Sequence, residues 1–114
     1  MASEASNLVL LYVTAQDVAE ATRMGRTLVQ ERLAACANVL PGMTSVYEWQ
    51  GELCESAEAV LVLKTRASLA GAAAERVRAL HSYDVPCVVT LPIVGGNGEF
   101  LQWVVRQTNE AGLG

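Results

Sequence analysis

Three cysteines and one histidine are the side chains of this 114-residue sequence that are best suited to metal or nucleophilic chemistry. Cys36, Cys54 and Cys87 are widely spaced, include no C-x-x-C pair and are odd in number. This pattern favours reduced thiols over a disulfide framework. A catalytic Cys/His pair would need His81, and nothing in the sequence shows that a cysteine meets it. We therefore predict a protein that is not an enzyme, with a hydrolytic or redox site as the less favoured alternative.

Motifs for other common chemistries are missing from the sequence. It contains neither the G-x-x-x-x-G-K-[ST] motif for nucleotide phosphates nor the H-E-x-x-H motif for zinc. The segment Thr14–Asp17 has no cysteines for a metal-chaperone loop and no arginine for an acylphosphatase-like site. The net charge is −4, the pI is near 4.9, and the basic residues are scattered, which argues against a nucleic-acid partner.

The composition favours an oligomer. Hydrophobic residues make up 52% of the chain and charged residues 18%, against about 25% charged in a typical soluble domain. The longest apolar run, Leu8–Val13, is far shorter than the ~20 residues of a membrane-spanning helix, so we expect no membrane insertion. An interface between copies of the chain is then the expected place for the surplus apolar surface. The first residues, MASEASN, resemble no export signal, so we predict a cytoplasmic protein with residues 1–6 as a flexible tail.

Hydrophobic periodicity predicts seven elements in the order β-α-β-β-α-β-α. The expected strands are Leu8–Thr14, Ala37–Gln50, Ala57–Thr65 and Val88–Val94, with the third beginning as early as Leu53 and a turn at Gly51-Glu52. The expected helices run from Gln16 or Asp17 to Ala34–Ala35, from an N-cap at Ser68 to Leu80, and over Glu99–Glu110. The first six elements form the split β-α-β arrangement, an antiparallel sheet with two helices on one face. We predict a single α+β domain of this ferredoxin-like type over residues 1–114, with an extra C-terminal helix.

The stretch ERLAACANVLPGMTSVYEWQGE, residues 31–52, resembles the signature of the CutA family of divalent-cation tolerance proteins. The resemblance continues through LVLKTR (Leu61–Arg66), ERVRALHSYDVP (Glu75–Pro86) and GNGEFLQWV (Gly96–Val104). It implies a homotrimer similar in build to the PII signalling proteins, in which the second and third strands form a long hairpin that reaches neighbouring subunits. Pro41-Gly42 would then mark a bend or bulge where the strand leaves its own sheet.

The metal chemistry of the family transfers to this chain only in part. Copper-binding members are linked to a cysteine at the end of the first strand and to an adjacent His-His pair. This chain has Val13 at the first position and Leu80-His81 at the pair. Cys87 stands where many members have glutamate, and its thiolate would favour soft ions. We therefore predict weak binding of Cu or Zn through His81 and Cys87 and no organic cofactor, with His81 as a dipole-facing residue at a helix C-terminus as the alternative.

The resemblance also implies a crevice between subunits, which would be lined by Tyr47, Trp49, Lys64, His81 and Tyr83. The two aromatics on the hairpin suit either interface packing or a ligand site, and Lys64 suits either solvent or a bound anion. The predicted function is a trimeric, copper-type divalent metal tolerance and binding protein. The alternative is a PII-like sensor or scaffold that binds a small anion or a partner protein in these crevices.

Overall fold

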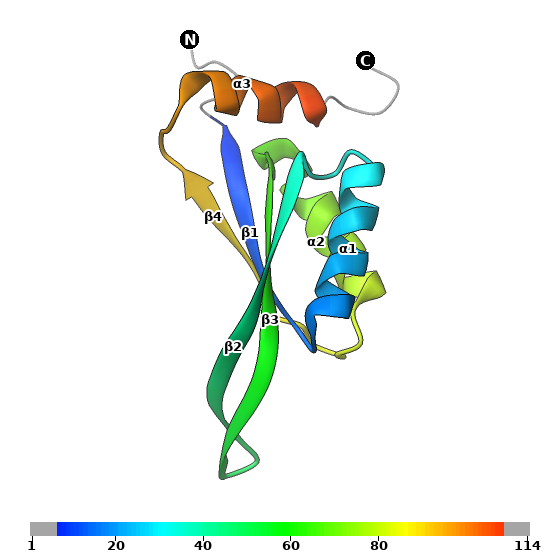
Figure 1. The fold of residues 1–114 in the computed structure, drawn as a ribbon, viewed down its shortest axis with the longest axis vertical. Helices are drawn as coiled ribbons and strands as arrows, with labels where there is room; N and C mark the ends of the chain where they lie inside the picture. Colours follow the sequence, from blue (N-terminus) through cyan, green and yellow to red (C-terminus); the bar gives the residue numbers. More distant parts are fainter. Residues whose placement is uncertain (1–6, 109–114) are drawn as a thin grey trace.

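The computed structural model describes residues 7–108, which form a four-stranded antiparallel sheet and three α-helices (Figure 1). The elements in chain order are β1 (Leu8–Ala15), α1 (Val18–Gln30), β2 (Cys36–Trp49), β3 (Glu52–Arg66), the 3-10 turn η2 (Ala67–Leu69), α2 (Ala70–Leu80), β4 (Val88–Ile93) and α3 (Gly98–Gln107). The strand order is β2-β3-β1-β4, which confirms the split β-α-β arrangement. The predicted tail, residues 1–6, lies outside the described residues.

Helices α1 and α2 cover one face of the sheet (Figure 1). The core lies between these layers, and because side chains alternate along a strand, every second residue of β1 and β3 enters it. Its fully buried members include Leu11 and Val13 from β1, Leu61 and Leu63 from β3, and Leu28 from α1. The helix and the sheet approach closely at Gly25, where a Cβ would lie 2.8 Å from the Cβ of Ala37.

Helix α3 lies across one end of the sheet rather than over its second face (Figure 1). It buries Val104 against Leu8 and Ala35 in a second, smaller core cluster. The face opposite α1 and α2 therefore remains open. Its exposed apolar side chains are Tyr12, Leu40, Val89 and Leu91, which are 38 to 49% exposed. The extra helix thus covers one end of the sheet and leaves these apolar side chains exposed.

Strands β2 and β3 continue past the sheet as a two-stranded arm, residues 43–58, which confirms the predicted long hairpin (Figure 1). Strand β1 ends at Ala15, which pairs with Ala59, and beyond this point β2 and β3 pair with each other alone in the described chain. At the tip, Gln50 and Gly51 have φ values of 51° and 82°, as in the hairpin turns that need left-handed residues. The turn is therefore Gln50-Gly51, one residue before the predicted Gly51-Glu52.

A β-bulge marks the point where the arm leaves the sheet. Leu40 pairs with Val60 and Met43 with Glu58, so Pro41 and Gly42 stand opposite the single residue Ala59. Gly42 has a φ of +73°, which only glycine adopts without strain. The bulge confirms the bend predicted at Pro41-Gly42.

Two predicted helix limits are wrong. Helix α1 ends at Gln30 rather than at Ala34–Ala35, because Arg32 adopts a φ of 60° and reverses the chain. Ser68 is not an N-cap: it lies inside η2, and the cap position of α2 is Leu69, which makes no side-chain capping bond. Helix α3 ends at Gln107, and residues 109 and 110 of its predicted C-terminal end lie outside the described part.

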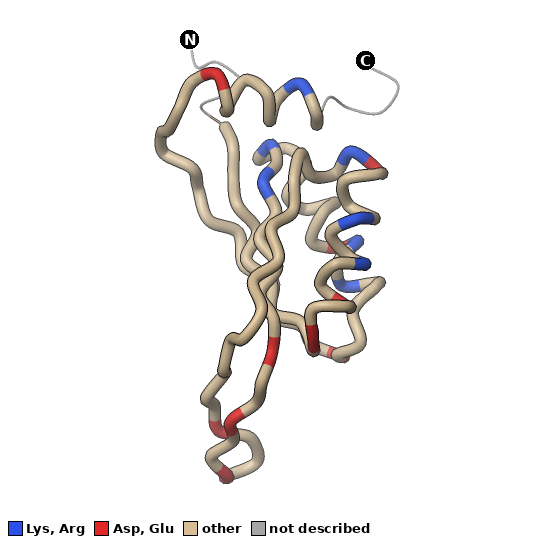
Figure 2. The backbone as a smooth tube through the Cα atoms, viewed as in Figure 1, with Lys and Arg blue, Asp and Glu red and all other residues tan. Residues whose placement is uncertain are grey.

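Charge is distributed unevenly over the molecule. Figure 2 shows acidic positions along the arm, and basic positions over the helices and the end of the sheet away from the arm. The arm carries Glu48, Glu52, Glu55 and Glu58 and no lysine or arginine. Any ligand drawn to the arm by its charge would therefore be a cation.

Candidate functional site

A groove of about 900 Å³ lies at the base of the arm. It is lined by the open face of β1, one side of the arm, and the loop between α2 and β4. Its lining residues are Tyr12, Thr14, Met43, Thr44, Ser45, Val46, Tyr47, Trp49, Glu58, Tyr83, Asp84, Val85 and Cys87. The groove combines aromatic surface, two carboxylates and a thiol, and none of its lining residues is basic.

Tyr83 connects the loop after α2 to the arm. Its hydroxyl donates to Glu58 Oε2 at 2.6 Å, and its ring lies 4.7 Å from the ring of His81, centroid to centroid. Burial, followed by the bond to Glu58, raises the pKa of Tyr83, so the phenol stays protonated and keeps donating. Tyr83 therefore fixes one oxygen of Glu58 and leaves the other for the groove.

His81 is buried behind the groove and is not among the residues that line it. Its Nε2 lies 2.7 Å from the carbonyl oxygen of Thr14, and its Nδ1 lies 3.1 Å from the backbone nitrogen of Tyr83. A carbonyl can only accept and a backbone N–H can only donate, so Nε2 carries the proton and Nδ1 accepts. Both ring nitrogens are thus in use, and a metal ligand at His81 would have to replace one of these bonds.

Glu20 is a buried carboxylate that the sequence analysis did not identify. Its Oε1 accepts from the backbone N–H of Gln16 at 2.9 Å, and its Oε2 accepts from the backbone N–H of Ser82 at 2.8 Å. Burial alone would raise the pKa of Glu20, but these hydrogen bonds outweigh it and lower the pKa. The signal was present in the sequence, because Asp17 and Glu20 have the D-x-x-E spacing of a capping box, and Asp17 Oδ1 does accept from the Glu20 N–H at 2.8 Å.

The predicted site residues fall into separate groups. Tyr47, Trp49, Tyr83 and Cys87 share the groove, whereas Lys64 is not among its lining residues. The ammonium of Lys64 bonds Asn38 and lies 3.8 Å from Cys36 Sγ and 5.9 Å from the centre of the Phe100 ring, near α3. Within one copy, the groove therefore lacks the cation that the small-anion alternative requires.

The thiols differ in their surroundings. Cys87 is exposed in the groove, Cys36 is half-buried beside Lys64, and Cys54 lies half-buried on the arm, where its Sγ donates to the carbonyl of Glu52. Among residues 7–108, no group of three or more His, Cys, Asp and Glu side chains is placed to hold a metal ion. A tight site for a divalent ion would need donors from outside these residues, such as those of another copy of the chain.

Comparison with protein-family models matches residues 9–107 to the CutA1 divalent ion tolerance proteins. This chain belongs to that family. It is 46% identical over 101 residues to the divalent-cation tolerance protein CutA of Thermus thermophilus, covering 89% of this chain and 96% of that protein. It is 44% identical over 103 residues to the chloroplastic protein CutA 1 of Oryza sativa subsp. japonica, covering 90% of this chain. It spans little more than half of the plant relatives, 58% of the rice protein and 55% of the Arabidopsis thaliana protein.

Solved CutA structures have the same fold. The crystal structure of CutA1 from Oryza sativa superposes with a TM-score of 0.90 at 42% identity, covering 95% of this chain and 99% of that one. The periplasmic divalent cation tolerance protein CutA of Archaeoglobus fulgidus gives a TM-score of 0.86 at 33% identity, covering 90% and 99%. Chloroplast and periplasm both occur in the names of CutA relatives, so the cytoplasmic location stays a prediction. No helix within residues 7–108 is long and apolar enough to cross a membrane.

Proposed function

We propose that this chain acts in divalent-cation tolerance as a trimeric binding or regulatory protein rather than as an enzyme. The observation that carries the proposal is the arm. It projects from the sheet with Val46, Trp49 and Leu53 between 62 and 76% exposed. Apolar surface of this kind on a projecting element marks an interaction site. The number of copies, three, comes from the resemblance of the sequence to CutA trimers.

Light scattering on the purified protein tests the assembly. We expect a mass about three times the chain mass of 12.1 kDa. The mass should change little on dilution through the micromolar range, because an obligate interface buries a large apolar area. A folded monomer in this range would contradict the proposal.

We further propose that the groove binds Cu or Zn weakly, with Cys87 as the soft donor. The support is the groove's charge, since its lining includes Glu58 and Asp84 and no basic residue. His81 would join only by giving up a bond to Thr14 or Tyr83, which lowers the affinity further. We expect a dissociation constant no tighter than micromolar, because each missing protein donor leaves the ion closer to its hydrated state.

Calorimetric titration of the trimer with Cu(II) and Zn(II) tests the ion site. Cys87→Ser should abolish most of the heat, while Cys36→Ser is the matched control and should bind as the wild type does. His81→Gln reports whether the buried imidazole contributes. Nanomolar binding that survives both Cys87→Ser and His81→Gln would show that the ion lies elsewhere and would contradict this site, but it would leave the trimer proposal standing.

A further inference from the structure

Arg32 occupies a position that normally belongs to glycine. The backbone N–H of Leu33 donates to the carbonyl of Leu28, and the N–H of Arg32 donates to that of Val29, at 2.9 and 3.1 Å. These two bonds are the Schellman motif, in which the residue at the Arg32 position takes a left-handed conformation. Arg32 has a φ of 60°, a conformation that is strained for arginine and unstrained for glycine. Such strain is a reason to ask what the side chain does.

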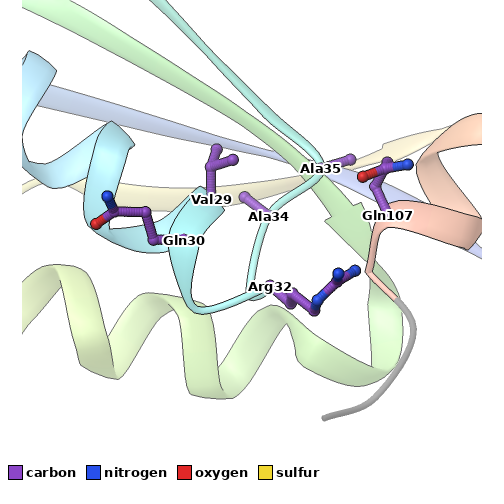
Figure 3. Close-up of a pocket in the computed structure, with 6 residues that line it drawn as sticks. All are labelled: Val29, Gln30, Arg32, Ala34, Ala35 and Gln107. Carbon is purple, nitrogen blue, oxygen red and sulfur yellow. The ribbon is translucent and has the colours of Figure 1, made fainter. Parts of the chain in front are cut away.

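The side chain of Arg32 lines a small pocket between the end of α1 and the end of α3 (Figure 3). The pocket has a volume of about 140 Å³ and is lined by Val29, Gln30, Arg32, Ala34, Ala35 and Gln107. In Figure 3 the arginine extends toward the end of α3, where the side chain of Gln107 lies. This volume fits one small ion rather than a drug-sized organic ligand, which needs about 300 Å³ or more.

The guanidinium of Arg32 is available to such an ion. Within residues 7–108 it makes no hydrogen bond and no ion pair. The neighbouring carboxylate, Glu31, is held by Arg76 through two bonds of 2.9 Å and so does not neutralise Arg32. Guanidinium groups bind planar or tetrahedral oxyanions through two parallel N–H bonds.

The surroundings of the pocket are compatible with an anion. The C-terminal end of a helix carries partial negative charge and repels anions. At the end of α1 this repulsion is reduced, because the carbonyls of Thr27, Leu28 and Val29 each accept a backbone N–H. At the end of α3, Arg66 donates to the carbonyl of Val105. This part of the molecule is also the one where basic positions gather, away from the acidic arm (Figure 2).

We propose that Arg32 and Gln107 form a binding site for a small oxyanion, phosphate or carboxylate, separate from the groove at the base of the arm. Arg32 supplies a two-pronged donor, and the amide of Gln107, which lines the same pocket, supplies a further N–H. An anion site at this position would explain why the chain has arginine at residue 32, where glycine would remove the backbone strain.

Calorimetry with inorganic phosphate and with acetate, at constant ionic strength and on the intact protein, tests the site. We expect saturable binding of one anion per chain, weakened at least tenfold by Arg32→Gln and several-fold by Gln107→Leu. Arg23→Gln removes the same charge from an exposed position on α1 and should bind as the wild type does. No binding to the wild-type protein at tens of millimolar, or equal binding by Arg32→Gln, would overturn the proposal.

Arg32→Gly separates a binding role from a structural one. Glycine suits the left-handed position, so without phosphate this variant should melt at the wild-type temperature or above it while losing the anion. The phosphate-induced shift of the Gln107 side-chain amide signal should also disappear from the NMR spectrum. A variant that melts well below the wild type without phosphate would show that Arg32 serves the fold, and this result would overturn the proposal.

Discussion

At the scale of single residues, Glu20 joins the start of α1 to the loop after α2, which lies 62 residues further along the chain. It lies in the first turn of α1, accepts from Gln16 at the end of β1, and accepts from Ser82 after α2. Its Oε2 also lies 4.0 Å from Nδ1 of His81. These contacts hold the loop that carries Tyr83, and through Tyr83 they position Glu58 in the groove.

Replacing Glu20 by glutamine should destabilise the protein by about 1–3 kcal/mol, because an amide nitrogen then faces a buried backbone donor. Urea unfolding at pH 7 and fixed protein concentration measures this loss. Glu75→Gln, at an exposed position on α2, is the control and should fall within about 0.5 kcal/mol of the wild type.

The same carboxylate predicts a pH dependence. Folding lowers the pKa of Glu20, so its stabilising contribution is present above the ordinary glutamate pKa and is lost as the pH falls below it. The stability difference between wild type and Glu20→Gln should therefore be large at pH 7 and should shrink toward pH 3. A difference that stays constant over this range would show that the charge of Glu20 does not matter.

At the scale of elements, two glycines in helices should respond oppositely to the same substitution. Gly25→Ala should destabilise by about 1–3 kcal/mol, since the new methyl meets Ala37 at 2.8 Å and Leu61 at 3.2 Å in a packed core. Gly71→Ala meets nothing within 4 Å and should stabilise by about 0.4–1 kcal/mol, through a less flexible unfolded chain. Thermal unfolding of both variants checks the pair, and a stable Gly25→Ala protein would mean that α1 moves easily on the sheet.

The elements that the sequence predicted most clearly are β1 and α1. The apolar run Leu8–Thr14 and the apolar stripe of α1 predicted the right element types, and Pro41-Gly42 located the bulge. The end of α1 was missed because an arginine, rather than a glycine, takes the left-handed position there. The N-cap predicted at Ser68 is wrong because the chain makes a 3-10 turn before α2, and the cap position of α2 makes no side-chain hydrogen bond.

The candidate site was predictable residue by residue but not as a constellation. Tyr47, Trp49, Tyr83 and Cys87 do meet, because β2 and the loop before β4 converge at the end of β1. Lys64 is predicted to join them in a crevice between subunits; within one copy it lies on β3 opposite Cys36, toward the other end of the strand, so its place in the crevice stays a prediction. The nitrogens of His81 bond to Thr14, 67 residues away along the chain, and to Tyr83, 2 residues away. No pattern in the sequence indicates the contact with Thr14.

At the scale of the whole molecule, the shape suits assembly better than an isolated chain. The described residues measure 50 × 26 × 21 Å, elongated by an arm that projects beyond the helices (Figure 1). The aromatic side chains of the arm and the apolar side chains of the open sheet face are both exposed in the single chain, and contact with other copies would bury them. Trp49, at 64% exposed, is the largest side chain on the arm.

Trp49→Ala should weaken the assembly by about 2 kcal/mol or more if the tryptophan anchors an interface. Light scattering over a dilution series measures the change as earlier dissociation. Val29→Ala, at an exposed position near the end of α1 that is distant from the arm, is the control and should dissociate as the wild type does. An unchanged trimer would instead show that Trp49 is a free surface residue or a ligand-binding residue of the groove.

The bulge at Pro41-Gly42 has a consequence for how this chain tolerates changes in length. Before the bulge, the even-numbered residues of β2, such as Asn38 and Leu40, share the open face with their partners on β3. After it, the odd-numbered Tyr47 and Trp49 lie on that face, because Pro41 and Gly42 together stand opposite the single residue Ala59. A single deletion between Met43 and Tyr47 would move both aromatics to the other face of the arm and point them away from Tyr83, whereas loss of Pro41 or Gly42 would only remove the bulge. Between Met43 and Tyr47, insertions and deletions should therefore survive in even numbers, even though the arm is among the most exposed parts of the fold.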